Sequence, residues 1–120
     1  AGMEAARPGA QVGDGGAAVE VVARHAGFSV AEDLAGHGVG YEVHEDPFVP
    51  NTGTKGAGEE LAPGLVIAIE PMLIDGPDGA VEFSDDGFTV FSERDDRAAH
   101  FEHTVAITHD GVRVLTAPAA

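Results

Sequence analysis

The stretch Gly36-His-Gly-Val-Gly-Tyr-Glu-Val-His-Glu-Asp-Pro47 places two imidazoles, His37 and His44, seven positions apart among glycines and carboxylates. Glycines on both sides of His37 remove Cβ atoms, so the backbone there can take a positive φ or let a ligand approach closely. We therefore expect a loop to present His37. The alternative is a glycine-rich turn with two solvated histidines, since short glycine patterns are weak motifs.

The composition is that of a single globular domain or part of one. The chain has 120 residues, 43% of them hydrophobic, and it contains no cysteine. Any metal must therefore be held by His, Asp and Glu, and a cytoplasmic location is expected because no disulfide framework is present. No apolar run approaches the roughly 18 residues that span a bilayer, and the N-terminus lacks the pattern of a signal peptide.

The charge of the chain argues against two classes of partner. The formal net charge is −15, with only six Lys and Arg residues. Nucleic-acid binding needs clustered basic residues, and anionic membranes also repel such a chain, so we expect neither partner. Most of the 21 acidic residues are interpreted as exposed groups that promote solubility.

The N-terminal part predicts helices followed by a long polar connection. Residues 1–7 resemble the end of a helix that Pro8-Gly9 stops, and residues 15–26 have apolar positions at helical spacing. Asp14 is the expected N-cap of this second helix and Gly27 its C′ glycine. After a short extended piece and the His37 loop, residues 46–64 form a Pro/Gly-rich connection of the kind that is often functional or mobile.

The C-terminal part predicts antiparallel strands. Residues 65–70 form an apolar run bounded by Gly64 and Pro71, typical of a buried strand, and residues 88–91 form a short strand. Residues 101–108 and 112–115 predict a hairpin around an Asp-Gly turn, and residues 117–120 a tail. No internal repeat or domain boundary is visible, so residues 1–120 are interpreted as one α+β domain or part of one.

Two carboxylates stand at strand ends. Glu70 shares a strand face with Val66 and Ala68 and is followed by Pro71, which stiffens the exit of the strand. Glu102 shares a face with the threonines and alanine at 104, 106 and 108. Taken alone, each of these two glutamates is most simply interpreted as a side chain that faces solvent. Together with His37 they make a donor set suited to Mn, Fe, Co or Zn.

The remaining histidines are interpreted as structural or solvated, namely His25, His100, His103 and His109. Two of these, His100 and His103, flank Glu102 and are available to hydrogen-bond to it.

Five segments carry a family resemblance: residues 36–40, 44–47, 49–51, 68–72 and 101–105. They resemble the successive signature segments of type I methionine aminopeptidases, in the same order and spacing, and the match covers nearly the whole chain. The resemblance implies the C-terminal half of a pita-bread fold, a curved antiparallel sheet with one or two helices on its outer face. It also implies a two-metal peptidase that removes the initiator methionine from nascent proteins.

The resemblance implies roles for particular residues. By motif position, His37, Glu70 and Glu102 fall on metal ligands, with Glu102 bridging both ions and Glu70 also assisting proton transfer. His44 falls on the histidine that contacts the scissile peptide. Phe88 stands in Asp-Gly-Phe-Thr where many relatives have Trp, and is expected to form an aromatic wall of the substrate pocket.

The chain also departs from the family pattern. Two aspartate ligands, a pocket cysteine and an early pocket histidine of the family lie further upstream than this chain reaches. We therefore expect at most one divalent ion, little activity without an N-terminal half as partner, and N-terminal methionine as the substrate group once that half is present. The alternatives are a non-catalytic peptide-binding or scaffold module of the pita-bread fold, and an α+β fragment without activity. The retained donors His37, Glu70 and Glu102 favour the peptidase, since a scaffold needs no metal ligands.

Overall fold

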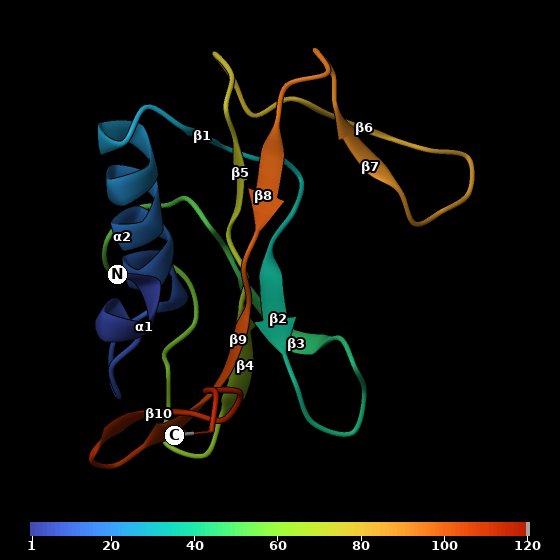
Figure 1. Cartoon of the computed structure of the whole chain (residues 1–120). Coiled ribbons are helices and arrows are strands. Elements are labelled where there is room, and N and C mark those ends of the chain that lie inside the picture. Colours follow the sequence, from blue (N-terminus) through green and yellow to red (C-terminus); the bar gives the residue numbers. More distant parts are fainter. Residues whose placement is uncertain (120) are drawn as a thin grey trace.

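Two helices lie on one side of a five-stranded antiparallel sheet, and two smaller sheets extend from one end of it (Figure 1). The computed structural model describes residues 1–119; Ala120, the last residue of the expected tail 117–120, lies outside the described residues. The helices are α1 (Gly2–Ala5) and α2 (Val12–His25). The strands are β1 (Ser29–Val30), β2 (Gly36–Gly38), β3 (Glu45–Val49), β4 (Val66–Ile69), β5 (Met72–Ile74), β6 (Val81–Phe83), β7 (Val90–Ser92), β8 (Ala98–His100), β9 (His103–Thr108) and β10 (Gly111–Val114).

The strand order explains how two sheets meet. The large sheet has the order β10-β9-β4-β2-β3, a second sheet has the order β1-β5-β8, and β6 and β7 form a separate hairpin. The paired strands β4 and β9 continue into the paired strands β5 and β8, so one antiparallel strand pair runs from the first sheet into the second. The short gap between these two sheets holds Glu70 and Glu102, two residues of the candidate site.

The core lies between the helices and one face of the large sheet. Strands β4 and β9 direct Ile67, Ile69, Val105 and Ile107 into it, and all four side chains are buried. This follows from the two-residue period of a strand, since these residues alternate with ones that face away. Burial of each such aliphatic side chain contributes about 1.5–3 kcal/mol. The opposite face of the same strands is consequently free for polar groups.

The predicted start of the second helix is wrong by three residues. Helix α2 begins at Val12 with Gln11 as its N-cap, and Asp14 lies in the first turn. Its Oδ2 accepts a hydrogen bond from the Gln11 backbone N–H at 2.8 Å, which is half of a capping box. The same carboxylate suits either position, which is why the sequence pattern misplaced the start. The C-terminal end is as predicted, with Gly27 at φ 83°.

The expected loop around His37 is also wrong, because His37 lies in strand β2. The expected connection 46–64 likewise begins inside strand β3. The glycines allow close approach of neighbouring strands: a Cβ at Gly36 would lie 2.2 Å from the carbonyl oxygen of Ala68, and one at Gly38 would lie 2.0 Å from that of Asp46. His37 is thus held by a sheet on both sides.

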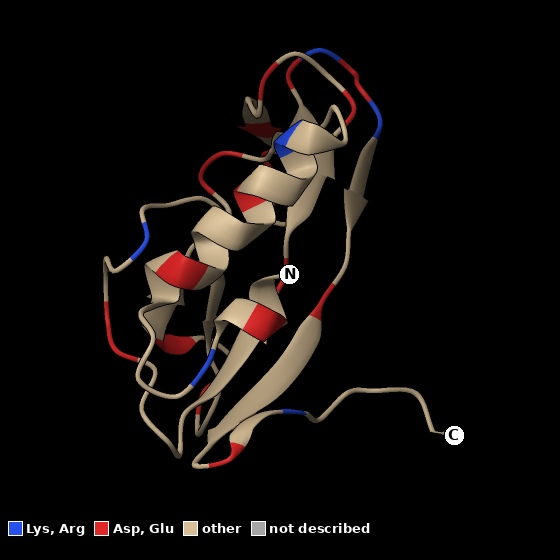
Figure 2. Ribbon diagram, turned by 90° about the vertical axis from the view of Figure 1, so that its left-hand side faces the viewer, with Lys and Arg blue, Asp and Glu red and all other residues tan. Residues whose placement is uncertain are grey.

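The remaining strands agree in part with the sequence pattern. The buried strand is β4, and the hairpin is β9 and β10, as predicted. The strand expected at residues 88–91 is β7, which begins two residues later and ends one residue later than predicted. Three short strands, β5, β6 and β8, are not predicted by the sequence pattern. The acidic residues spread over helices, strands and loops (Figure 2). No helix of the described residues is long and apolar enough to cross a bilayer.

Candidate metal centre

Glu70 and Glu102 lie opposite each other in the gap between the two sheets. The flanking strand pairs share one register, with Ile69 opposite His103 on one side and Met72 opposite His100 on the other. Across the same gap the Phe101 N–H donates to the carbonyl oxygen of Pro71 at 3.3 Å. Directly opposed residues project from the same face of a sheet. Both carboxylates therefore face away from the core.

His37 reaches this face from strand β2. Its Nε2 lies 3.2 Å from Oε1 of Glu70, and the two side chains are only 17% and 13% exposed. Its Nδ1 lies 2.8 Å from the carbonyl oxygen of Gly38, which can only accept, so Nδ1 carries the proton. In the neutral ring Nε2 then presents a lone pair to a carboxylate oxygen. Two such acceptors need a proton or a cation between them, and this orientation is typical of metal-binding histidines.

His100 approaches the other oxygen of the same carboxylate. Its Nε2 lies 3.1 Å from Oε2 of Glu70. Glu70, His100 and Glu102 each offer one donor atom, and these atoms lie within 4.8 Å of one another; within residues 1–119 no other trio of metal-type side chains does so. His37 is not part of that trio, although it contacts Glu70. The sequence interpretation had placed His100 only as a neighbour of Glu102.

The two other predicted site residues are His44 and Phe88. The ring of His44 lies beside that of His37, with centroids 4.2 Å apart and planes inclined by 57°. Phe88, in the β6–β7 hairpin, is 92% exposed. It lines a largely apolar cavity of about 290 Å³ whose wall also includes Met72 and His100. His44 thus lies beside His37, and Phe88 borders a cavity that His100 also lines.

Two neighbouring side chains have structural roles. Asn51 is 3% exposed, and its Nδ2 donates to the backbone carbonyls of Glu70 at 3.2 Å and Leu34 at 3.5 Å. It therefore holds the backbone that carries the Glu70 carboxylate. His103, which the sequence interpretation grouped with His100, instead has its Nδ1 3.0 Å from Oγ1 of Thr116.

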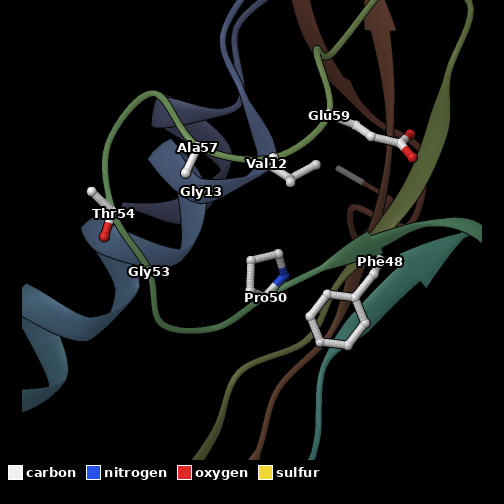
Figure 3. Close-up of a pocket in the computed structure, with 9 residues that line it drawn as sticks. Val12, Gly13, Phe48, Pro50, Gly53, Thr54, Ala57 and Glu59 are labelled. Carbon is white, nitrogen blue, oxygen red and sulfur yellow. The ribbon is translucent and has the colours of Figure 1, made fainter.

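A second hollow shares no residue with this centre (Figure 3). It has a volume of about 310 Å³ and lies between α2 and the chain that follows β3. Its wall comprises Val12, Gly13, Phe48, Pro50, Gly53, Thr54, Ala57, Gly58 and Glu59. With one carboxylate among mostly small or apolar groups, this hollow lacks a set of metal donors.

The donor chemistry of the centre fits a divalent metal. Like charges directly opposite each other destabilise a sheet, so the pair Glu70 and Glu102 favours a cation between them. The available donors are imidazole nitrogen and carboxylate oxygen, which suit Mn, Fe, Co and Zn. Glu70 presents one carboxylate oxygen to each of two imidazoles, with Nε2 of His37 at 3.2 Å and Nε2 of His100 at 3.1 Å.

Comparisons with known proteins agree with this chemistry. The model of metallopeptidase family M24 matches residues 1–109. Methionine aminopeptidase A of Synechocystis sp. is 45% identical over 115 residues, covering 96% of this chain and 45% of the relative. The methionine aminopeptidase of Aquifex aeolicus is 48% identical over 117 residues, covering 95% and 45%.

The solved structures show the same relationship. The crystal structure of methionine aminopeptidase from Thermotoga maritima matches with a TM-score of 0.91 and 42% identity, covering 98% of this chain and 47% of that one. The described residues thus adopt part of the pita-bread fold, which confirms the expected architecture. The chain spans less than half the length of these relatives. Because a family model matches nearly the whole chain and the fold and the donor set agree with it, the chain belongs to the metallopeptidase family M24.

Proposed function

We propose that residues 1–120 form one part of a methionine aminopeptidase domain, the part that supplies three metal ligands. The observation that carries this proposal is the contact of His37 Nε2 with Glu70 Oε1 at 3.2 Å, on the face where Glu102 stands opposite Glu70. The two named relatives, at 45% and 48% identity, support methionine aminopeptidase over other metallopeptidases. The substrate group would be the N-terminal methionine of nascent polypeptides, which emerge in the cytoplasm.

His37, Glu70 and Glu102 would hold the divalent ion, with Co, Mn, Fe or Zn as candidates. A bound ion supplies Lewis acidity toward the peptide carbonyl and lowers the pKa of water. Glu70 would accept the proton of the attacking water and pass it to the leaving amine. His44, beside His37, would donate a hydrogen bond to the oxygen of the scissile carbonyl as negative charge develops there. Phe88 would border the site of the methionine side chain.

A non-catalytic scaffold is the second candidate, and the site geometry argues against it. Two opposed carboxylates destabilise the strand pair that carries them, and a protein without a use for a cation has no reason to keep them. The proposed partner is an N-terminal half like that of the relatives, because the resemblance places the two aspartate ligands there. Without those ligands we expect at most one firmly held ion and little turnover.

The test supplies that partner. The chain is mixed with the segment of the Synechocystis relative that precedes the matched region, and methionine release from a Met-Ala-Ser peptide is measured with added Mn or Co. We expect release from the mixture and none from the chain alone, with EDTA abolishing it. Glu70→Gln should abolish the release, whereas Glu82→Gln, at an exposed position of β6, should leave it unchanged.

Two outcomes would contradict the proposal. Release by the mixture that survives Glu70→Gln would show that Glu70 has no part in the reaction. A mixture that forms a complex, as judged by gel filtration, but releases no methionine with either metal would show that the chain does not supply an aminopeptidase centre.

A further inference from the structure

His100 is not among the metal ligands that the family resemblance assigns, yet it contacts the same carboxylate as His37. Glu70 faces one imidazole at each of its oxygens, His37 at Oε1 and His100 at Oε2. The two separations, 3.2 and 3.1 Å, are nearly equal. The separation from Glu70 that supports His37 as a ligand is therefore matched at His100.

The strand register explains why His100 stands there. His100 lies two residues before Glu102, and the two-residue period of a strand puts both side chains on one face. Met72 is the residue directly opposite His100, so Glu70 is its diagonal neighbour on that face. Three donors, from residues 70, 100 and 102, thus come from one pair of strands.

The position of His100 also connects the carboxylates with the neighbouring cavity. It is half-exposed, and together with Phe88 and Met72 it lines the cavity of about 290 Å³. A ligand at this position would leave coordination sites open toward the cavity. Three protein donors with open positions are what catalytic metal sites provide.

We propose that His100 is a direct ligand of the divalent cation, in a site formed with Glu70 and Glu102. This deepens the proposed function, because it rests on the same metal centre, but its test does not depend on peptidase activity. His100 supplies a third donor next to the two carboxylates, so that three donor atoms lie within 4.8 Å of one another. His37 contacts Oε1 of Glu70, whereas His100 contacts Oε2.

Metal affinity is the first measurement. Titration calorimetry with Mn compares the unaltered chain with His100→Gln and with His103→Gln. His103 also flanks Glu102 but contacts Thr116, so it is a matched control. We expect the affinity to fall by about tenfold or more for His100→Gln, since even partners of a ligand affect affinity by about 10–100-fold. The affinity of the His103→Gln variant should not change.

Nitrogen NMR distinguishes a ligand from a residue that only orients Glu70. With 15N-labelled histidine in the unaltered chain, added Zn should move the Nε2 resonance of His100 to the range of a metal-bound nitrogen, and should leave that of His109 in place. A residue that only hydrogen-bonds to Glu70 would keep a protonated Nε2. This measurement needs no variant, so it stands even if His100→Gln fails to fold.

The outcomes separate this inference from the proposed function. A Zn-dependent change at His37 without one at His100 would refute the ligand role of His100 and leave the centre of His37, Glu70 and Glu102 intact. Equal Mn affinity of the His100→Gln variant would also refute the role of His100. Absence of any metal binding by the unaltered chain would overturn this inference, whereas the proposed function is decided by methionine release from the mixture.

Discussion

Replacement of Gly16 by alanine tests how helix α2 is attached to the chain that leads to the site. A Cβ at Gly16 would lie 2.4 Å from the carbonyl oxygen of Thr52 and 2.8 Å from that of Pro50. Both are backbone atoms, which cannot move aside as the end of a side chain can. At Gly15, one position earlier in the same helix, the nearest atom would be the Gly2 carbonyl oxygen at 3.8 Å, an ordinary contact.

Alanine has the same effect on helix propensity at both positions, but it causes steric overpacking only at Gly16. Alanine in place of glycine within a helix stabilises by about 0.5–1 kcal/mol. At Gly16 the overpacking costs about 1–3 kcal/mol. We expect Gly15→Ala to raise the free energy of unfolding by about 0.5–1 kcal/mol from the helix term. The Gly16→Ala variant should have a free energy of unfolding about 1–3 kcal/mol lower than that of the Gly15→Ala variant, because the added methyl group is overpacked at Gly16.

Urea unfolding followed by far-UV circular dichroism measures both values. The two variants should unfold with similar m-values, so that the midpoints report stability directly. The displaced segment at Gly16 includes Asn51, which holds the Glu70 backbone, so Mn affinity should fall in Gly16→Ala and stay unchanged in Gly15→Ala. A Gly16→Ala variant as stable as Gly15→Ala would refute the close-packing argument.

Two further predictions concern single side chains. Asn51→Ala removes the donor to the carbonyl oxygens of Leu34 and Glu70, and should lower the free energy of unfolding by about 1–3 kcal/mol in urea titrations; an unchanged midpoint would show that water replaces the amide. The Thr89 hydroxyl, followed by neighbouring backbone amides, lowers the pKa of Asp86 from 3.8 to about 2. Ionised Asp86 therefore stabilises its turn above pH 4, and this contribution is lost as the pH falls toward 2. NMR titration should show that Thr89→Val raises the pKa of Asp86, and an unaltered value would contradict this cause.

The sequence by itself determined the features that depend on local periodicity. The alternation in residues 101–115 with an Asp-Gly turn predicted the β9–β10 hairpin, and the apolar run before Glu70 predicted strand β4. The same alternation predicted which residues share a strand face with Glu70 and which with Glu102, whereas the orientation of both carboxylates away from the core comes from the pairing of the strands. These features were predictable because side-chain direction in a strand follows from its own residue order.

Only the tertiary structure decided which elements meet and at what distance. The glycines around His37 are compatible with a loop or a strand, and the choice depends on the approach of β3 and β4 to β2. Strand β8 has three residues, too few for a periodic signal, so the position of His100 on the carboxylate face appears only once β8 pairs with β5. Long-range pairing, with its register set by the partner strand, brought the second imidazole to Glu70.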